Sequence, residues 1–123
     1  GTTYGGNLLA CRAALVYLEA LDEGGLLAHV RRAGAHFEAG LRALAARHPV
    51  AADVRGAGLM WGLVLSVDAA PVVPAALARG LIVNRTNERV IRMLPPLVIT
   101  EAEIDRGLAL LDEVLGDVFG SQA

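Results

Sequence analysis

The sequence predicts an α+β fold, with a small sheet of about four short strands, helices packed on one face and a long N-terminal connecting helix. Apolar residues recur at helical spacing over residues 7–47 and again after Thr100, whereas the segment between them has the short apolar runs of strands. The 123 residues are 54% hydrophobic, which is enough to bury a core.

The first two predicted helices cover residues 7–22 and 26–47. In both, apolar residues recur every three or four positions, which places them on one side of a helix. Asn7 is the expected N-cap of the first helix. Gly24-Gly25 should end that helix, and His48-Pro49 should end the second.

Strands are expected at residues 50–55, 59–65, 81–83 and 90–94, with a short helix over 68–79 and a polar turn over 84–88. The second strand does not alternate between apolar and polar residues, which predicts burial on both of its faces. Thr100 and Glu103 have the spacing of a capping box and predict the start of the last helix. Residues 117–123 are expected to fray.

Composition excludes several classes of function. The net charge is −2, so no basic field favours nucleic acid. Cys11 is the only cysteine, which excludes an internal disulfide and fits a reducing compartment, here the cytoplasm. No apolar run is long enough for a membrane span. His29, His36 and His48 lack the spacing of a metal site, so no metal is expected.

All 11 basic residues are arginines. Any chemistry that needs a lysine amine, such as a Schiff base, therefore cannot be completed by this chain.

The first candidate site is the polar, glycine-rich segment Gly1–Asn7, which runs directly into the first helix. The hydroxyls of Thr2 and Thr3 and the backbone N–H groups ahead of a helix can cradle an anion. The alternative interpretation is a simple glycine-rich entry to a helix that Asn7 caps.

The second candidate is Arg92, which interrupts an apolar strand between Ile91 and Met93. A guanidinium that points from a sheet into a cleft binds both oxygens of a carboxylate. The alternatives are a solvated arginine on the outer face of an edge strand and an internal ion pair.

Read together, these motifs resemble the C-terminal part of the class III pyridoxal-phosphate-dependent aminotransferases, and most closely the acetylornithine aminotransferases. The resemblance rests on four ordered segments: Gly1–Asn7, Leu9-Ala10-Cys11, Val54–Met60 and Ile91–Leu97. It covers essentially the whole chain. One departure is Leu8, which stands where the family commonly has proline.

The resemblance implies a domain organisation. Residues 1–23 would end the large domain with a phosphate-contacting loop and the connecting helix, and residues 24–123 would form the small C-terminal domain. The chain begins at Gly1, within a motif, so we expect it to be a piece of a longer protein. The Schiff-base lysine of the family would lie upstream, and this segment alone should be inactive and should not retain the cofactor.

The resemblance also implies roles for three residues. Thr3 would bind the phosphate of pyridoxal 5′-phosphate across the interface of a homodimer, while Thr2 and Arg92 would contact substrate. The implied reaction transfers the amino group of N2-acetylornithine to 2-oxoglutarate, in arginine biosynthesis. Partners would be small amino acids and 2-oxo acids, with no nucleic acid and no membrane. Ornithine, succinylornithine or 4-aminobutyrate aminotransferase, or a non-catalytic binding module of the same fold, remain the alternatives.

Overall fold

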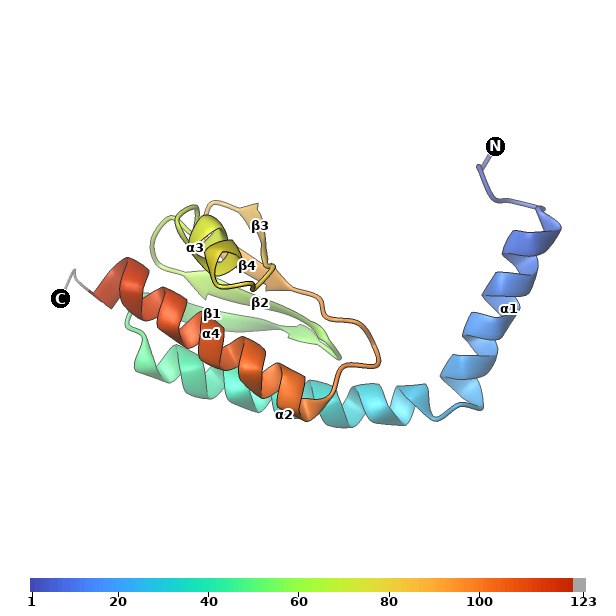
Figure 1. The fold of residues 1–123 in the computed structure, drawn as a ribbon, viewed down its shortest axis with the longest axis horizontal. Coiled ribbons are helices and arrows are strands. Elements are labelled where there is room, and N and C mark those ends of the chain that lie inside the picture. The colour runs from blue at the N-terminus through green and yellow to red at the C-terminus, as the bar shows by residue number, and fades with distance from the viewer. Residues whose placement is uncertain (121–123) are drawn as a thin grey trace.

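The computed structural model describes residues 1–120, which contain four helices and one four-stranded sheet (Figure 1). In chain order the elements are α1 (Leu8–Asp22), α2 (Leu26–Arg47), β1 (Ala51–Ala57), β2 (Met60–Leu65), α3 (Val72–Ala78), β3 (Asn84–Asn87), β4 (Val90–Met93) and α4 (Glu101–Phe119). This arrangement confirms the predicted α+β class.

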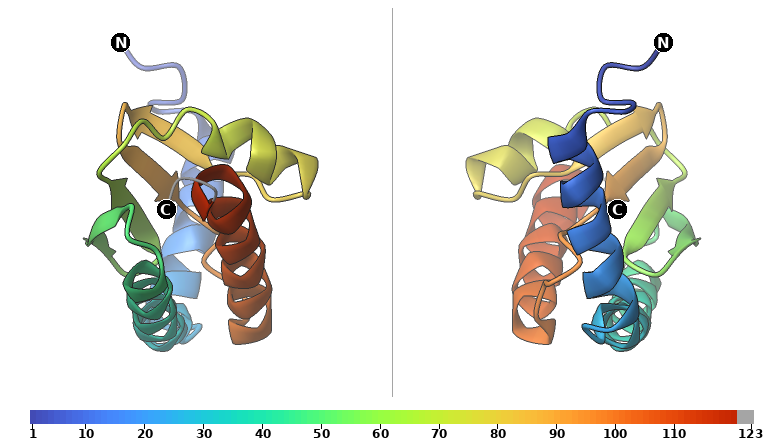
Figure 2. Two further views of the ribbon diagram at one scale, coloured as in Figure 1. Left: turned by 90° about the vertical axis from the view of Figure 1, so that its left-hand side faces the viewer. Right: turned by 90° about the vertical axis from the view of Figure 1, so that its right-hand side faces the viewer.

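The sheet is antiparallel throughout, in the order β1-β2-β4-β3, and α2, α3 and α4 lie on one side of it (Figure 2). Burial in β2 therefore alternates: Trp61, Leu63 and Leu65 are buried, whereas Gly62 and Val64 are half-buried. The prediction that this strand is buried on both faces is wrong for this chain, because helices cover only one face. We call the other side the open face of the sheet.

The core lies between the sheet and the two long helices. Its fully buried large side chains are Leu41, Leu44, Leu63, Leu65, Val72, Ile91, Leu111, Val114 and Leu115. They come from α2, β2, α3, β4 and α4, so the sheet and helices share one apolar layer. Burial of such side chains contributes about 1.5–3 kcal/mol each relative to exposure, which makes this layer the main source of stability.

The third strand is the clearest error of the sequence-based prediction. Residues 81–83 lie outside any strand, and the polar segment expected to turn forms strand β3 instead. Val83 is buried, so its apolar character reflects contact with the core rather than sheet pairing. The side chains of β3 are exposed because it is an edge strand that pairs only with β4.

Helix ends follow local hydrogen bonding. Thr100 and Glu103 form the predicted capping box, in which each side chain bonds the backbone N–H of the other residue. Helix α4 continues to Phe119, so the expected fraying of residues 117–119 is wrong, and residues 121–123 lie outside the described part. The helix expected over 68–79 is shorter, since the Asp68 carboxylate accepts from the N–H of Ala70 in a turn before it.

Helix α1 projects from the rest of the molecule and packs only against the start of α2 (Figure 1). None of its residues is buried. The large apolar side chains that it exposes are Leu8, Leu9, Leu15, Val16, Tyr17 and Leu18. No helix within residues 1–120 combines the length and apolar character that a membrane crossing requires.

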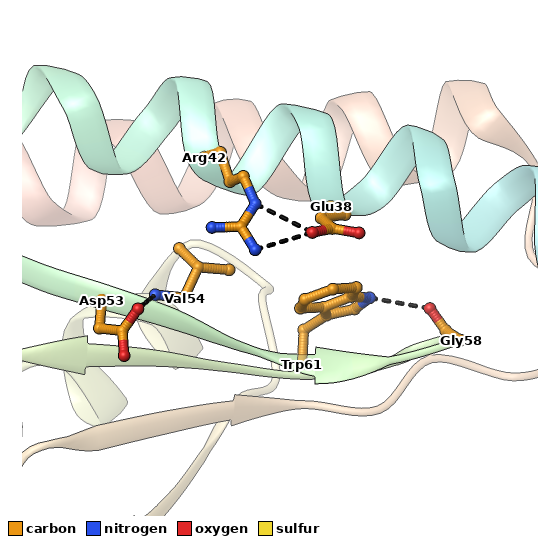
Figure 3. A network of polar contacts seen from close by, with 6 residues as sticks. All are labelled: Glu38, Arg42, Asp53, Val54, Gly58 and Trp61. Carbon is orange, nitrogen blue, oxygen red and sulfur yellow. Dashed lines mark hydrogen bonds and ion pairs between the residues drawn. The ribbon is translucent and has the colours of Figure 1, made fainter.

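A close backbone contact joins α2 to the β1–β2 hairpin. Gly34 of α2 faces the carbonyl of Gly58, the turn residue, which has φ of +56°. The same carbonyl oxygen accepts from the Trp61 indole N–H at 2.8 Å (Figure 3). A side chain at Gly34 would place its Cβ 2.4 Å from that oxygen, so the absence of a side chain sets how closely helix and hairpin approach.

Candidate anion-binding loop and carboxylate clamp

The N-terminal loop is folded by its own polar groups. The Thr2 hydroxyl accepts from the N–H of Gly5 at 2.9 Å, and Gly6 takes a φ of +80° that favours glycine. The Asn7 carboxamide oxygen accepts from the N–H of Ala10 at 3.1 Å, which confirms Asn7 as the N-cap of α1. The loop therefore has a defined turn immediately before a helix N-terminus.

Thr3 is the threonine of this loop whose hydroxyl makes no hydrogen bond within residues 1–120. Its side chain is exposed, and segment 1–7 contains no carboxylate. Hydroxyl and N–H donors without a competing anion suit a phosphate group, especially ahead of a helix whose N-terminal dipole favours negative charge. The donor set thus fits the phosphate of pyridoxal 5′-phosphate.

Arg92 lies on the open face of the sheet. Its neighbour in β4, Ile91, is fully buried in the core, and successive side chains of a strand point to opposite faces. Arg92 pairs with Gly62 of β2 on one side and with Asn84 of β3 on the other. Its neighbour across the sheet is therefore a residue without a side chain on the β2 side and an amide on the β3 side. Half-buried Val64 and Val90 make up the neighbouring row.

Arg92 combines two properties that no other arginine within residues 1–120 combines. Arg92 is half-buried, and within residues 1–120 no carboxylate lies within ion-pair distance of it, whereas Arg79 and Arg85, whose side chains are 32% and 34% exposed, both pair with acidic side chains. Six others pair with acidic side chains, namely Arg12, Arg42, Arg47, Arg55, Arg79 and Arg85. A half-buried arginine that has no carboxylate partner is a candidate to bind an anion from outside the chain.

The structure does not bring the two candidate sites together. The loop with Thr2 and Thr3 lies at the far end of α1, whereas Arg92 lies on the sheet (Figure 1). Sequence reasoning missed Asn84 and Gly62, which flank Arg92 across the sheet. No signal in the sequence identifies them, because their proximity depends on strand register.

The three histidines serve structure and hold no metal cluster. His29 contacts the carbonyl of Ile99 at 2.9 Å, while the Nε2 atoms of His36 and His48 lie 2.6 Å from the carboxylates of Asp105 and Asp112. His36 therefore links α2 to α4, His48 links the C-cap of α2 to α4, and His29 links α2 to the loop before α4. Among residues 1–120 no group of three or more metal-ligating side chains is placed to hold an ion.

The contact between His48 and Asp112 predicts a pH-dependent contribution to stability. Hydrogen bonding from His48, reinforced by Arg47, holds the pKa of Asp112 below its ordinary value of 3.8. A depressed carboxyl pKa stabilises the fold above the unfolded-state pKa, and this contribution is lost as the pH falls through the folded-state pKa. We expect Asp112→Asn to cost about 1 kcal/mol at neutral pH, and this cost should shrink as the pH falls below the ordinary carboxyl pKa of 3.8, measured by urea unfolding across pH.

The control for this prediction is Asp105→Asn, which removes the same type of contact with His36. His36 is 36% exposed whereas His48 is 14% exposed, so solvent screening should make the loss at Asp105 smaller. A cost for Asp112→Asn that does not change between pH 7 and pH 3 would contradict the electrostatic explanation.

A polar, glycine-rich loop precedes α1, and a half-buried arginine lies on the open face of the sheet. Residues 1–115 match the family "Aminotransferase class-III". The chain belongs to the class-III aminotransferase family.

Individual proteins that are similar to this chain are also aminotransferases. The acetylornithine aminotransferase of Caldanaerobacter subterraneus is 41% identical over 118 residues, which cover 95% of this chain and 30% of that protein. The acetylornithine aminotransferase of Elizabethkingia anophelis has a TM-score of 0.86 at 27% identity, covering 95% of this chain and 30% of the other. A lysine aminotransferase from M. tuberculosis has a TM-score of 0.87 at 32% identity, covering 96% and 28%. The chain thus spans less than a third of the length of these relatives.

Proposed function

We propose that this chain is the C-terminal part of a pyridoxal-phosphate-dependent aminotransferase. Residues 1–23 would complete the large domain, and residues 24–123 would form the small domain. The observation that carries the proposal is Arg92, a half-buried arginine on the open face without a carboxylate partner in residues 1–120. Such a group suits the carboxylate that amino-acid and 2-oxo-acid substrates share.

The cofactor, when bound, supplies the electron sink that lets an amino group move between carbon skeletons. The residues of this chain would position the reactants. Thr3 would donate to the phosphate in the site of the neighbouring subunit of a homodimer, and Thr2 would lie beside substrate. Arg92 would hold a substrate carboxylate. The lysine for the Schiff base would come from the upstream part of the protein, because this chain has none.

For the substrate, we favour transfer from N2-acetylornithine to 2-oxoglutarate, a step of arginine biosynthesis expected in the cytoplasm. Support comes from relatives at 41–44% identity that bear the name acetylornithine aminotransferase. Fold similarity does not choose the donor, since the lysine aminotransferase matches as well as the acetylornithine enzyme. Kinetics of the complete enzyme with acetylornithine, ornithine, succinylornithine and 4-aminobutyrate test this choice, and preference for another donor would reject it.

A non-catalytic binding module of the same fold is the rival interpretation, favoured by the absence of lysine from the chain. The two differ in the reading frame upstream of Gly1. An open frame that encodes a large domain with the lysine supports the enzyme, whereas a start codon directly before Gly1 supports the module.

Replacement of Thr3 tests the cofactor role without reference to turnover. In the complete enzyme, Thr3→Ala should weaken retention of pyridoxal 5′-phosphate by about tenfold to a hundredfold, because a hydrogen bond to a charged phosphate contributes about 1.5–3 kcal/mol. Equilibrium dialysis followed by absorbance of the bound cofactor measures this. Thr3→Ser keeps the hydroxyl and should retain most of the affinity. Unchanged affinity in Thr3→Ala would reject the assignment.

A further inference from the structure

The strand register places an amide next to the guanidinium of the carboxylate clamp. Asn84 of β3 pairs directly with Arg92 of β4, so both side chains emerge from the same face of the sheet. Directly opposed residues have Cβ atoms about 4.5–5.5 Å apart, so a carboxylate on the guanidinium is within reach of the amide. Val83, the residue before Asn84, is buried in the core, in agreement with this orientation.

The chain leaves both groups free for a ligand. Within residues 1–120 the side chains of Asn84 and Arg92 have no hydrogen-bonding partner. Asp53, the carboxylate of β1, is engaged by Arg55 at 2.7 Å and by the N–H of Val54 at 2.8 Å. Positive charge on the open face at Arg92 is therefore not neutralised from β1.

The opposite flank of Arg92 is bare. Gly62 of β2 occupies the paired position, and a Cβ there would come within 3.2 Å of the Val90 side chain. With hydrogen at this position, the half-buried side chains of Val64 and Val90 form an apolar floor beside Arg92, against which a short carbon chain can lie. Such a row combines a cation, a neutral donor and a floor, which is what a carboxylate on an aliphatic chain requires.

We propose that Asn84 is a second substrate-binding residue, which donates its amide N–H to the carboxylate held by Arg92. The inference rests on the proposed aminotransferase function and adds a residue to its carboxylate site. The ligand class is a short aliphatic dicarboxylate, such as the 2-oxo acid that accepts the amino group. Because Asn84 is neutral, it strengthens the binding of the carboxylate without adding charge to the site.

The test uses the complete enzyme with its cofactor and takes glutarate, a five-carbon dicarboxylate, as a competitive inhibitor against 2-oxoglutarate. Asn84→Ala should raise the inhibition constant of glutarate about tenfold, and the KM for 2-oxoglutarate similarly, with kcat nearly unchanged. Asn84→Asp should have a larger effect, about a hundredfold, because its carboxylate would occupy Arg92 itself.

The matched control is Asn87→Asp. Asn87 lies on the same strand, and its side-chain oxygen accepts from the N–H of Arg89, a role that an aspartate can keep. It adds the same charge three positions along the chain, and its effect on glutarate should stay below about threefold. Thermal unfolding of each variant checks that the fold is intact.

The outcomes are separable. An enzyme that does not transaminate at all would reject the proposed function. If the enzyme is active, and Arg92→Ala weakens the binding of glutarate whereas Asn84→Ala does not, only the role of Asn84 is rejected. A loss of kcat in Asn84→Ala with unchanged KM and inhibition constant would also overturn it, since that pattern indicates a structural role.

Discussion

Arg92→Ala in the complete enzyme should raise the KM for 2-oxoglutarate by about tenfold to a hundredfold, because a charge-assisted hydrogen bond contributes about 1.5–3 kcal/mol. In the proposed site, removal of the guanidinium would leave the substrate carboxylate against Gly62 and two half-buried valines, Val64 and Val90, without a counter-charge. Arg92→Lys should restore only part of the affinity, since an ammonium lacks the planar fork that binds both oxygens. Steady-state kinetics of each half-reaction would measure the change.

The control for net charge is Arg89→Ala. Arg89 is exposed in the turn between β3 and β4 and loses the same charge on the same hairpin. Its replacement should change the KM by less than about threefold, because an exposed charge at this distance is screened. Equal effects of the two variants would place Arg92 among ordinary surface arginines and would remove the main support for the carboxylate clamp.

Gly34→Ala should lower the free energy of unfolding of the 123-residue chain by about 1–3 kcal/mol, although alanine is the better helix former. Its Cβ would lie 2.4 Å from the Gly58 carbonyl oxygen, a backbone atom that cannot rotate aside. Displacement of that carbonyl would also strain its hydrogen bond from Trp61. Urea unfolding followed by fluorescence of Trp61, the only tryptophan, measures both effects.

Gly40→Ala is the matched control on the same helix. Its Cβ would meet Cδ1 of Leu108 at 2.3 Å, but this is the end of a flexible side chain that can change rotamer. The gain in helix propensity, about 1 kcal/mol, should roughly offset the repacking. A Gly34→Ala variant as stable as Gly40→Ala would show that the hairpin can move away from α2 without cost.

Helices could be predicted closely from the sequence because their signals are local. The N-caps Asn7 and Thr100 act through hydrogen bonds to residues three positions away, and both were recognised. Strands depend on distant partners. The apolar segment 81–83 contacts the core through Val83 and does not pair in the sheet. The polar segment β3 is a strand because its backbone pairs with β4. Apolar character alone could not separate these two causes.

The candidate site shows the same division. From the residues alone, the loop with Thr2 and Thr3 could be proposed as an anion cradle and Arg92 as a carboxylate clamp, and the family resemblance then singled out Thr3. Asn84 could not, because its importance depends on which residue of β4 lies opposite it. The outward direction of Arg92 also required the structure, as its strand could have presented either face to the helices.

Helix α1 also has a mechanical consequence. Its 15 residues make a rod about 22 Å long at 1.5 Å per residue, joined to α2 through Gly24-Gly25. Over that length, a rotation of about 5° at the glycine pair moves the loop with Thr3 by about 2 Å, roughly two-thirds of a hydrogen-bond length. Gly25 has a φ of +69°, so a bulkier residue there would alter the angle of the rod. A small change in the angle of this junction therefore becomes a larger displacement of the loop that carries Thr3.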